Sequence, residues 1–423
     1  MANWPNLHRR VVVTGIGAVS PVGLNAQETW ASLLAGKSGA GPITLFDAKD
    51  YSTTFACEVK GFSADAHLSP KDQRKMDRFI HLGIVAAMHA WKDAGFDGRS
   101  ETCGVEAEKF GIIMSAGMGG LPLIEDTVHT IVNKGPRRVT PFFIPSVIPN
   151  LTAGHLSIML NARGPNVCVV SACASSSHAI GEAALMISRG DCDVMIAGGS
   201  ESVICPSGIG GFGAMKALST RNDAPAKASR PFDRDRDGFV MGEGGAALVL
   251  EDYERARKRG ARILGEVCGY GSTADAHHIT TPAPEGEGAG RCMRQALDRG
   301  CIDPTKVGYI NAHGTSTPAG DENESIAVER VFGDHARKLI VNSTKSMTGH
   351  LLGGAGALEA VISLQVLETG DVPPTINLDN PDGNCRLNYA AHQATRLPAG
   401  TEFVLSNSFG FGGTNASLVF GRV

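Results

Sequence analysis

The stretch from Val167 to Ser177 reads Val-Cys-Val-Val-Ser-Ala-Cys-Ala-Ser-Ser-Ser and joins two kinds of pattern. The apolar run at 167–170 predicts a buried strand, while the alanine-rich run at 174–189, followed by Gly190 as a left-handed cap, predicts a helix. Cys173 then lies at the N-terminus of that helix. There the helix dipole and free backbone N–H groups favour a thiolate and can hold an oxyanion, which indicates a nucleophile with a lowered thiol pKa. A buried structural cysteine is the alternative interpretation.

On both sides of this elbow, strand-like runs alternate with helical patterns along the chain. Such alternation predicts an α/β fold with largely buried sheets. The charged run 251–260 is typical of a surface helix, and we expect a boundary near residue 260, between an N-terminal half 1–260 and a C-terminal half 261–423. In each half a strand is followed by a small-residue turn, a weak sign of duplication. The expected strands are 11–14, 111–114, 167–170, 194–197, 246–250, 307–312, 339–341 and 403–406, and a second helix is expected at 356–368.

The composition argues against several classes of protein. With 39 Lys and Arg against 43 Asp and Glu, the net charge of -4 gives no overall attraction to nucleic acid or to an anionic membrane. No run reaches the ~18 apolar residues of a membrane-spanning helix, and a strand-like run from residue 11 leaves no room for a signal peptide. None of the 10 cysteines has the Cys-x-x-Cys spacing, so we expect reduced thiols and a cytoplasmic protein.

Two further motifs contain histidines that follow predicted strands. His313 lies in Asn-Ala-His-Gly-Thr-Ser-Thr (311–317), at the carboxyl end of a strand, where ligand-facing groups collect. A capped surface histidine is the alternative. Lys345 and His350 lie in Asn-Ser-Thr-Lys-Ser-Met-Thr-Gly-His (342–350), ahead of a glycine-rich helix start. Because Lys345 precedes the glycines, this segment is not a phosphate-binding loop, and we expect it to present a charge and an imidazole to one pocket.

The fourth motif, Ser-Asn-Ser-Phe-Gly-Phe-Gly-Gly-Thr-Asn (406–415), surrounds Phe409 and Phe411 with glycines. Glycines permit loop movement, which predicts that the rings gate an apolar tunnel. Three other kinds of ligand site are excluded because their residues lack the required spacing. The dinucleotide fingerprint is incomplete here, the aspartates of 233–237 lack a glutamate at the twelfth calcium-loop position, and His277-His278 has no neighbouring zinc ligand. We therefore expect no metal, and leave open a pocket-lining role for His278.

Taken together, the cysteine elbow, Asn-Ala-His-Gly-Thr-Ser-Thr, Ser-Thr-Lys-Ser-x-x-Gly-His and Gly-Phe-Gly-Gly-Thr-Asn resemble the motifs of the β-ketoacyl-acyl carrier protein synthases, in the same order and spacing. Residues 230–244 resemble the central signature of that family, so the match covers essentially the whole chain. Segments 73–79 and 117–121 look more like its type II than its type I members. Serines at 176 and 177, where glycine or alanine is commoner, are a departure that concerns local packing.

The resemblance implies a thiolase-like fold, in which two similar halves form a five-layered αβαβα sandwich, and a homodimer. It also implies a decarboxylative condensation, in which Cys173 carries the acyl group and His313 and His350 hydrogen-bond the enolate formed from malonyl-acyl carrier protein. Lys345 is expected to support this polar site. Its candidate charge partners are Asp321 and Glu324, the oxyanion hole is expected from the backbone N–H groups of Cys173 and Phe411, and the acyl pocket and gate are expected from Met118, Phe212, Phe409 and Phe411.

A carrier protein would need a local basic face, because the chain as a whole is negative. Lys71, Arg74 and Lys75 stand at i, i+3 and i+4 of a predicted helical stretch, so they should project from one side. Arg137 and Arg138, which the resemblance places near the pocket mouth, add a second pair. A solvated helix face is the alternative.

We expect an elongating synthase of fatty acid synthesis. No cofactor is expected beyond the phosphopantetheine arm that carries the substrates. The expected partners are acyl carrier protein, in acyl and malonyl forms, and a second copy of the chain, without nucleic acid or membrane. The alternatives are a polyketide condensing enzyme and a non-catalytic chain-length partner, although the second predicts loss of Cys173. His350 argues against a degradative thiolase, which has a second cysteine there.

Overall fold

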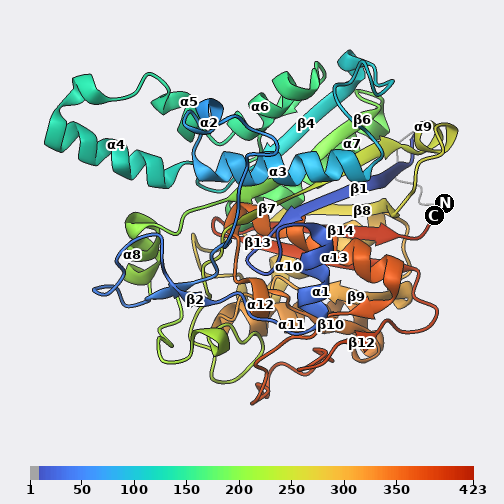
Figure 1. The fold of residues 1–423 in the computed structure, drawn as a ribbon. Helices are drawn as coiled ribbons and strands as arrows, with labels where there is room; N and C mark the ends of the chain where they lie inside the picture. Colours follow the sequence, from blue (N-terminus) through green and yellow to red (C-terminus); the bar gives the residue numbers. More distant parts are fainter. Residues whose placement is uncertain (1–8) are drawn as a thin grey trace.

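The computed structural model describes residues 9–423, so the first eight residues of the predicted N-terminal half lie outside the described part. Its main sheet has ten strands in the order β10-β9-β13-β14-β8-β1-β7-β6-β4-β5 (Figure 1). The strands are β1 Val11–Val19, β4 Phe110–Ser115, β5 Asn166–Val167, β6 Val194–Glu201, β7 Gly244–Asp252, β8 Gly265–Ala274, β9 Val307–Asn311, β10 Ile340–Asn342, β13 Phe403–Gly410 and β14 Thr414–Gly421.

The two halves of this sheet repeat one topology. Numbered along the chain within each half, the five strands lie in the order third, second, fourth, fifth, first, with parallel pairs in the first two steps and antiparallel pairs in the last two. The first strands of the halves, β1 and β8, pair antiparallel, with Val12 opposite Glu266. The boundary expected near residue 260 falls between helix α9 (Tyr253–Lys258) and β8.

Helices cover both faces of each half, and two of them lie between the halves, which also meet at the paired strands β1 and β8. Helices α3 (Arg78–Asp93) and α6 (Leu151–Leu160) pack on the N-terminal strands, and α10 (Glu287–Arg299) packs on the C-terminal ones with α11 (Pro318–Phe332) beside it. Between them lie α7 (Ser175–Arg189) and α13 (Ala355–Thr369), which contact strands of both halves. The predicted five-layered αβαβα sandwich of two similar halves is therefore confirmed.

The remaining elements are short or peripheral. Helix α4 projects from the body of the molecule in Figure 1. None of the helices within residues 9–423 is long and apolar enough to cross a bilayer. The short or peripheral elements are α1 Ala26–Leu34, α2 Pro70–Gln73, α4 Leu121–Lys134, α5 Phe143–Val147, α8 Pro206–Ala214, α9 Tyr253–Lys258, α12 Lys345–Thr348, β2 Gly41–Pro42, β3 Phe55–Ala56, β11 Asp371–Val372 and β12 Thr395–Arg396.

The strand predicted at 167–170 is wrong in length and in burial. Strand β5 ends at Val167 and, within residues 9–423, pairs only with β4, at the edge of the sheet. Val167 and Val170 are 39% and 55% exposed. The chain leaves the sheet early because Ser171 is held elsewhere: its N–H donates to Ser175 Oγ, and its carbonyl accepts from Thr414 Oγ1.

The two serines that depart from the family pattern connect the middle layer. Ser176 Oγ accepts a hydrogen bond from the backbone N–H of Ala357 in α13 at 2.9 Å. The hydroxyl of Ser177 lies 2.8 Å from that of Ser408 in β13. Both serines are fully buried, and these bonds satisfy their polar atoms.

Candidate active site

Cys173 lies in a single 3-10 turn, Ala172–Ala174, that leads directly into α7. The preceding Ala172 has φ of 49°, in the left-handed region that costs energy for any residue with a Cβ atom. The end of β13 fixes the other side of this turn. A Cβ atom on Gly410 would lie 2.9 Å from the carbonyl oxygen of Ser171 and 3.1 Å from the backbone nitrogen of Cys173, so glycine permits the close approach. The thiol is thus presented on a sharp, constrained elbow.

The predicted lowering of the Cys173 thiol pKa is wrong, because burial dominates the other effects. Burial raises the pKa of the Cys173 thiol to about 11, against the opposing effects of the Lys345 charge and the backbone N–H groups of Phe411 and Cys173. These two N–H groups lie close enough to the sulfur to affect it, so they are near the carbonyl oxygen of a thioester that the sulfur would attack. The thiol of the unloaded site is protonated at neutral pH.

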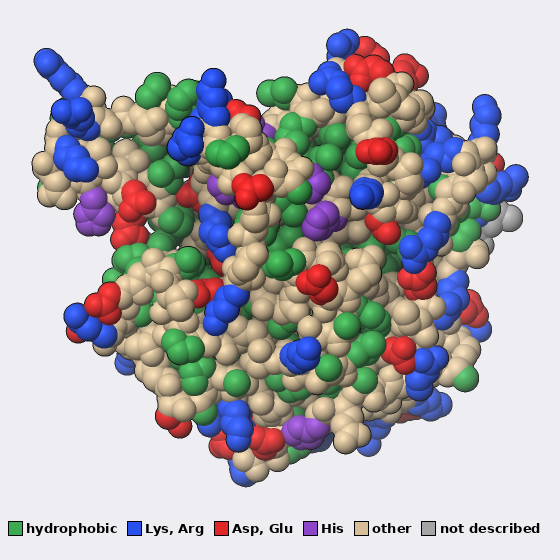
Figure 2. Space-filling model, viewed as in Figure 1, with side chains coloured by type: hydrophobic (Ala, Val, Ile, Leu, Met, Phe, Trp, Pro, Cys, Tyr) green, Lys and Arg blue, Asp and Glu red, His purple; other side chains and the backbone are tan. Residues whose placement is uncertain are grey.

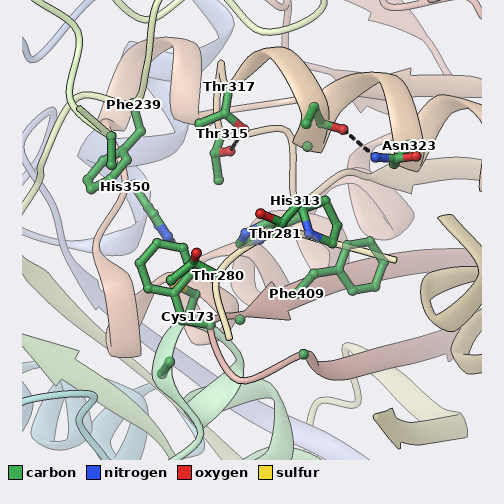
Figure 3. A pocket seen from close by; sticks show the side chains of 18 of the residues that line it. Cys173, Phe239, Thr280, Thr281, His313, Thr315, Thr317, Asn323, His350 and Phe409 are labelled. Atoms are coloured by element: carbon green, nitrogen blue, oxygen red, sulfur yellow. Dashed lines mark hydrogen bonds between the residues drawn. The ribbon is translucent and has the colours of Figure 1, made fainter. Parts of the chain in front are cut away.

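His313 and His350 reach the same space from different elements. His313 follows β9, and His350 is held by its own N–H, which donates to the carbonyl of Val240. Their ring centroids lie 5.3 Å apart at an interplanar angle of 84°. Figure 3 shows both rings and Cys173 around one space.

Both imidazoles are neutral and have nitrogens available for a ligand. Burial, and next the positive charge of Lys345, holds the pKa of each ring well below its usual value. Within the described chain, Nδ1 of His313 and both ring nitrogens of His350 are buried without a hydrogen-bond partner. Unpaired buried polar atoms are costly unless a ligand uses them. The pair is therefore suited to bind an oxygen atom of a substrate.

Lys345 forms a buried ion pair with Glu359 of α13, which corrects the expected pairing with Asp321 or Glu324. Asp321 instead accepts from the N–H groups of Phe232 and Ser316. Glu324 accepts from the N–H groups of His313 and Gly314, at 2.9 and 2.8 Å. Glu324 thereby supports the backbone of the histidine motif. The expected partners came from the histidine motif that precedes Lys345, whereas the fold brings in a carboxylate from the helix that follows it.

One cavity of about 590 Å³ joins these groups. Cys173, His313 and His350 line it together with the four residues expected for the acyl pocket and gate, which are Met118, Phe212, Phe409 and Phe411. The Phe411 ring lies 6.3 Å from that of Phe212, while the Phe409 ring lies 5.8 Å from His313. Phe411 therefore faces the apolar wall. Phe409 borders His313 (Figure 3).

A segment that the sequence analysis missed packs on the Phe411 loop. Asp275 accepts from Asn415 Nδ2 at 2.7 Å and from the N–H of Ala283 at 3.0 Å, and its own N–H donates to the carbonyl of Gly413. The N–H of Gly412 donates to the carbonyl of Ile279. Movement of the Phe411 loop thus requires breaking bonds to 275–283. The only feature of the sequence that pointed to this segment was the pair His277-His278. The imidazole of His278 accepts from the N–H groups of Thr280 and Thr281 at the surface of that turn.

The basic residues expected to dock a carrier lie on two neighbouring segments. Helix α2 ends at Gln73, before Arg74 and Lys75. Lys71 and Arg74 are exposed, whereas Lys75 is part-buried and pairs with Asp72 at 2.8 Å. Lys75 also lies 5.5 Å from the ring centre of Phe142, which joins the α2 segment to the chain that follows Arg137 and Arg138. Both of these arginines are exposed. Figure 2 shows basic side chains gathered over this part of the surface.

Neither of the two metal sites that the sequence analysis weighed is formed in the structure. Among residues 9–423 no group of three or more His, Cys, Asp or Glu side chains is placed to hold a metal ion. Asp233, the first aspartate of the apparent calcium loop, is buried and paired with Arg230 at 3.0 Å.

Comparison with known proteins gives matches over nearly the full chain. The families described as "Beta-ketoacyl synthase, N-terminal domain" and "Beta-ketoacyl synthase, C-terminal domain" match residues 8–256 and 264–379. A 3-oxoacyl-[acyl-carrier-protein] synthase 2 from Coxiella burnetii is 50% identical over 415 residues, which cover 98% of this chain and 99% of that protein.

Two solved structures show the same fold. A β-ketoacyl synthase from Burkholderia phymatum has a TM-score of 0.91 and 37% identity, covering 98% of this chain and all of its own. In a complex of a type II polyketide acyl-carrier protein with its ketosynthase bound to the hexaketide, the matching chain has a TM-score of 0.90 and 32% identity, and the match covers 98% of this chain and 100% of that one.

Proposed function

The chain belongs to the β-ketoacyl synthase family, and we propose that it is an elongating 3-oxoacyl-[acyl-carrier-protein] synthase of fatty acid synthesis. The observation that carries the proposal is one cavity in which an elbow cysteine meets two neutral histidines with unpartnered nitrogens. The reaction is a decarboxylative condensation of an acyl group with malonyl-acyl carrier protein.

The first step loads the acyl chain on Cys173. Its sulfur attacks the thioester carbonyl of an acyl carrier protein, the bond from that carbonyl carbon to the pantetheine sulfur breaks, and the thiol proton passes to the leaving sulfur. The developing oxyanion accepts hydrogen bonds from the backbone N–H groups of Cys173 and Phe411. Their effect on the Cys173 thiol supports this assignment.

The second step uses the histidines. Malonyl-acyl carrier protein loses carbon dioxide, and the enolate oxygen that forms accepts hydrogen bonds from His313 and His350. The enolate carbon attacks the thioester on Cys173, the bond to the Cys173 sulfur breaks, and that sulfur takes up a proton. Neutral rings suit this role, because each imidazole N–H donates to charge only as it develops. Lys345, paired with Glu359, supports the polar side of the site.

The rival functions fit less well. A non-catalytic chain-length partner would lack the nucleophile, whereas Cys173 is present on its elbow. A polyketide condensing enzyme would use the same chemistry, but the matching chain of the polyketide complex is 32% identical to this chain and the Coxiella burnetii synthase is 50% identical. The reaction needs no cofactor apart from the pantetheine arm of its substrates.

We also propose acyl carrier protein and a second copy of the chain as partners. The acidic carrier would dock on the exposed side chains of Lys71, Arg74, Arg137 and Arg138.

The second copy would pair through the same free edge of β5, where Val167 and Val170 are exposed. Each protomer would divide near residue 260 into a half with the nucleophile and a half with the histidines.

The test is to incubate the protein with a ladder of acyl-acyl carrier proteins plus malonyl-acyl carrier protein and to identify products and adducts by mass. We expect 3-oxoacyl products two carbons longer and an acyl adduct on Cys173. Cys173→Ala should abolish both while the fold persists. An adduct on Cys168, or condensation by the alanine variant, would overturn the proposal.

A further inference from the structure

Glu201 is a buried carboxylate in the cavity wall to which the proposed reaction gives no role. It is the last residue of β6, has no exposed surface, and lines the same cavity as Cys173. In the described chain no basic side chain pairs with it. Instead four backbone N–H groups donate to it: those of Gly117, Met118, Gly119 and Gly353, at 2.6, 3.1, 2.9 and 3.1 Å.

The backbone around Glu201 is shaped to reach this carboxylate. A Cβ atom on either Gly117 or Gly353 would lie 2.7 Å from Glu201 Oε2, so only glycine allows both segments to approach. Gly119 has φ of 69°, which turns a third N–H toward the same group. Burial raises the pKa of the Glu201 carboxyl to about 7, and the four N–H groups oppose that rise, because a proton on the carboxyl would face another N–H. Above pH 7 the site therefore holds a negative charge stabilised by these backbone dipoles.

This charge lies on the apolar side of the cavity. Its donors include the N–H of Met118, and Met118 packs with Phe212, Leu352 and Cys173 in one hydrophobic cluster. Glu201 raises the pKa of the Cys173 thiol, so its field reaches the sulfur, whereas Lys345 on the histidine side lowers it. The two ends of the site thus carry charges of opposite sign. Because little water separates the groups, such a field is screened less than at a surface.

We propose that Glu201 makes the acyl side of the site selective for neutral chains, by repelling acyl groups that carry a carboxylate from thioester formation on Cys173. Malonyl is such a group, so Glu201 would keep the second substrate from being loaded in place of the first. This inference rests on the proposed function. The bond changes are those of the loading step, with the malonyl or neutral acyl carbonyl as the carbon attacked.

The test compares two isosteric donors, the pantetheine thioesters of succinic acid and of succinamic acid, which differ in one charged carboxylate against a neutral amide. The rate of adduct formation on Cys173 is followed by intact mass at pH 8. We expect the wild type to load the amide faster. Glu201→Gln should lower the ratio of the amide rate to the acid rate by about tenfold, the size of the repulsion between two like charges about 12 Å apart at an effective dielectric constant of ~20.

Two variants separate charge from structure. Glu201→Asp keeps the charge but draws it back by one methylene group, so its ratio should lie between those of the wild type and Glu201→Gln. Glu58→Gln is a matched control remote from the cavity, since Glu58 is also buried and accepts from the N–H groups of Thr44 and Leu45. It should leave the ratio unchanged.

A parallel loss of both loading rates in Glu201→Gln, with the ratio kept, would show that Glu201 only ties the two glycine segments together and would overturn the inference. If Glu201→Gln does not fold, the Asp variant decides, and a ratio equal to that of the wild type overturns the inference. Equal loading of both donors by the wild type would also do so. Failure of the wild type to load either donor would instead contradict the proposed acylation of Cys173.

Discussion

Removing the carboxylate of Glu359 should destabilise the protein strongly, because Lys345 would be left as an unpaired buried charge. The side chains of Lys345 and Glu359 are only 2% and 3% exposed. Breaking a buried pair by removing one partner costs about 3–5 kcal/mol. That is a large part of a total free energy of unfolding of about 5–15 kcal/mol. Glu359→Gln keeps the shape of the side chain, so it isolates the charge.

The measurement is guanidinium unfolding of the wild type and Glu359→Gln, with Glu402→Gln as the control. Glu402 pairs with Lys306 at 2.7 Å, but these side chains are 54% and 48% exposed, so this control should change the free energy of unfolding too little to measure. The double variant Lys345→Met/Glu359→Leu should recover most of the lost stability, since it removes both charges. A loss in Glu359→Gln as small as in the control, or no recovery in the double variant, would refute the reasoning.

Four further outcomes are expected. Alanine at His313 or His350 should slow malonyl decarboxylation by ~100- to 1000-fold and should slow acylation of Cys173 less. Single-turnover assays of each step separate the two effects. A larger loss in acylation than in decarboxylation would mean that the roles are misassigned. Because burial and Lys345 lower the pKa of both rings, decarboxylation should not fall as the pH drops through 6.5, and a pH profile with a fall centred there would contradict neutral histidines. Phe411→Ala should admit malonyl-acyl carrier protein before the acyl group is loaded, seen as decarboxylation without primer; unchanged substrate order would count against a gate. Reversing Lys71 and Arg74 to glutamate should raise the KM for carrier-bound substrates, weaken its salt dependence and spare short pantetheine thioesters, whereas equal losses on both would indicate a structural role.

The residues that carry short-range chemistry could be predicted from the sequence, because each sits in a local pattern. The elbow at Cys173, the strand end at His313 and the glycine loop at Phe411 all follow from strand-to-turn transitions within a few residues. Burial could not be predicted from run length and composition alone, because the equally short runs at 11–14 and 194–197 do become buried strands. The short run at 167–170 has an apolar composition, yet it becomes an exposed sheet edge, and composition does not show which strand lies last in a sheet.

Long-range partners could not be predicted, because their spacing follows from the sandwich and not from the chain. Glu359 lies between apolar residues in the middle of helix α13, whereas the other glutamate of that helix, Glu368, lies at its exposed end. That position was a usable signal that Glu359 needs a buried partner. The carboxylate of Glu201 gave no such signal, since its partners are backbone N–H groups of glycines 84 and 152 positions away.

The same distinction explains the error over the nucleophile. A helix N-terminus is visible in the sequence and argues for a lowered thiol pKa, whereas desolvation depends on what the fold places around the sulfur, and here it outweighs the dipole. A protonated resting thiol surrounded by apolar side chains reacts when a bound thioester supplies the carbonyl and a sulfur that can accept the proton. The backbone N–H groups of Cys173 and Phe411 then stabilise the oxyanion. The reactivity of Cys173 therefore depends on a loaded cavity, so the shape and charge of that cavity control both the rate of loading and the choice of what is loaded.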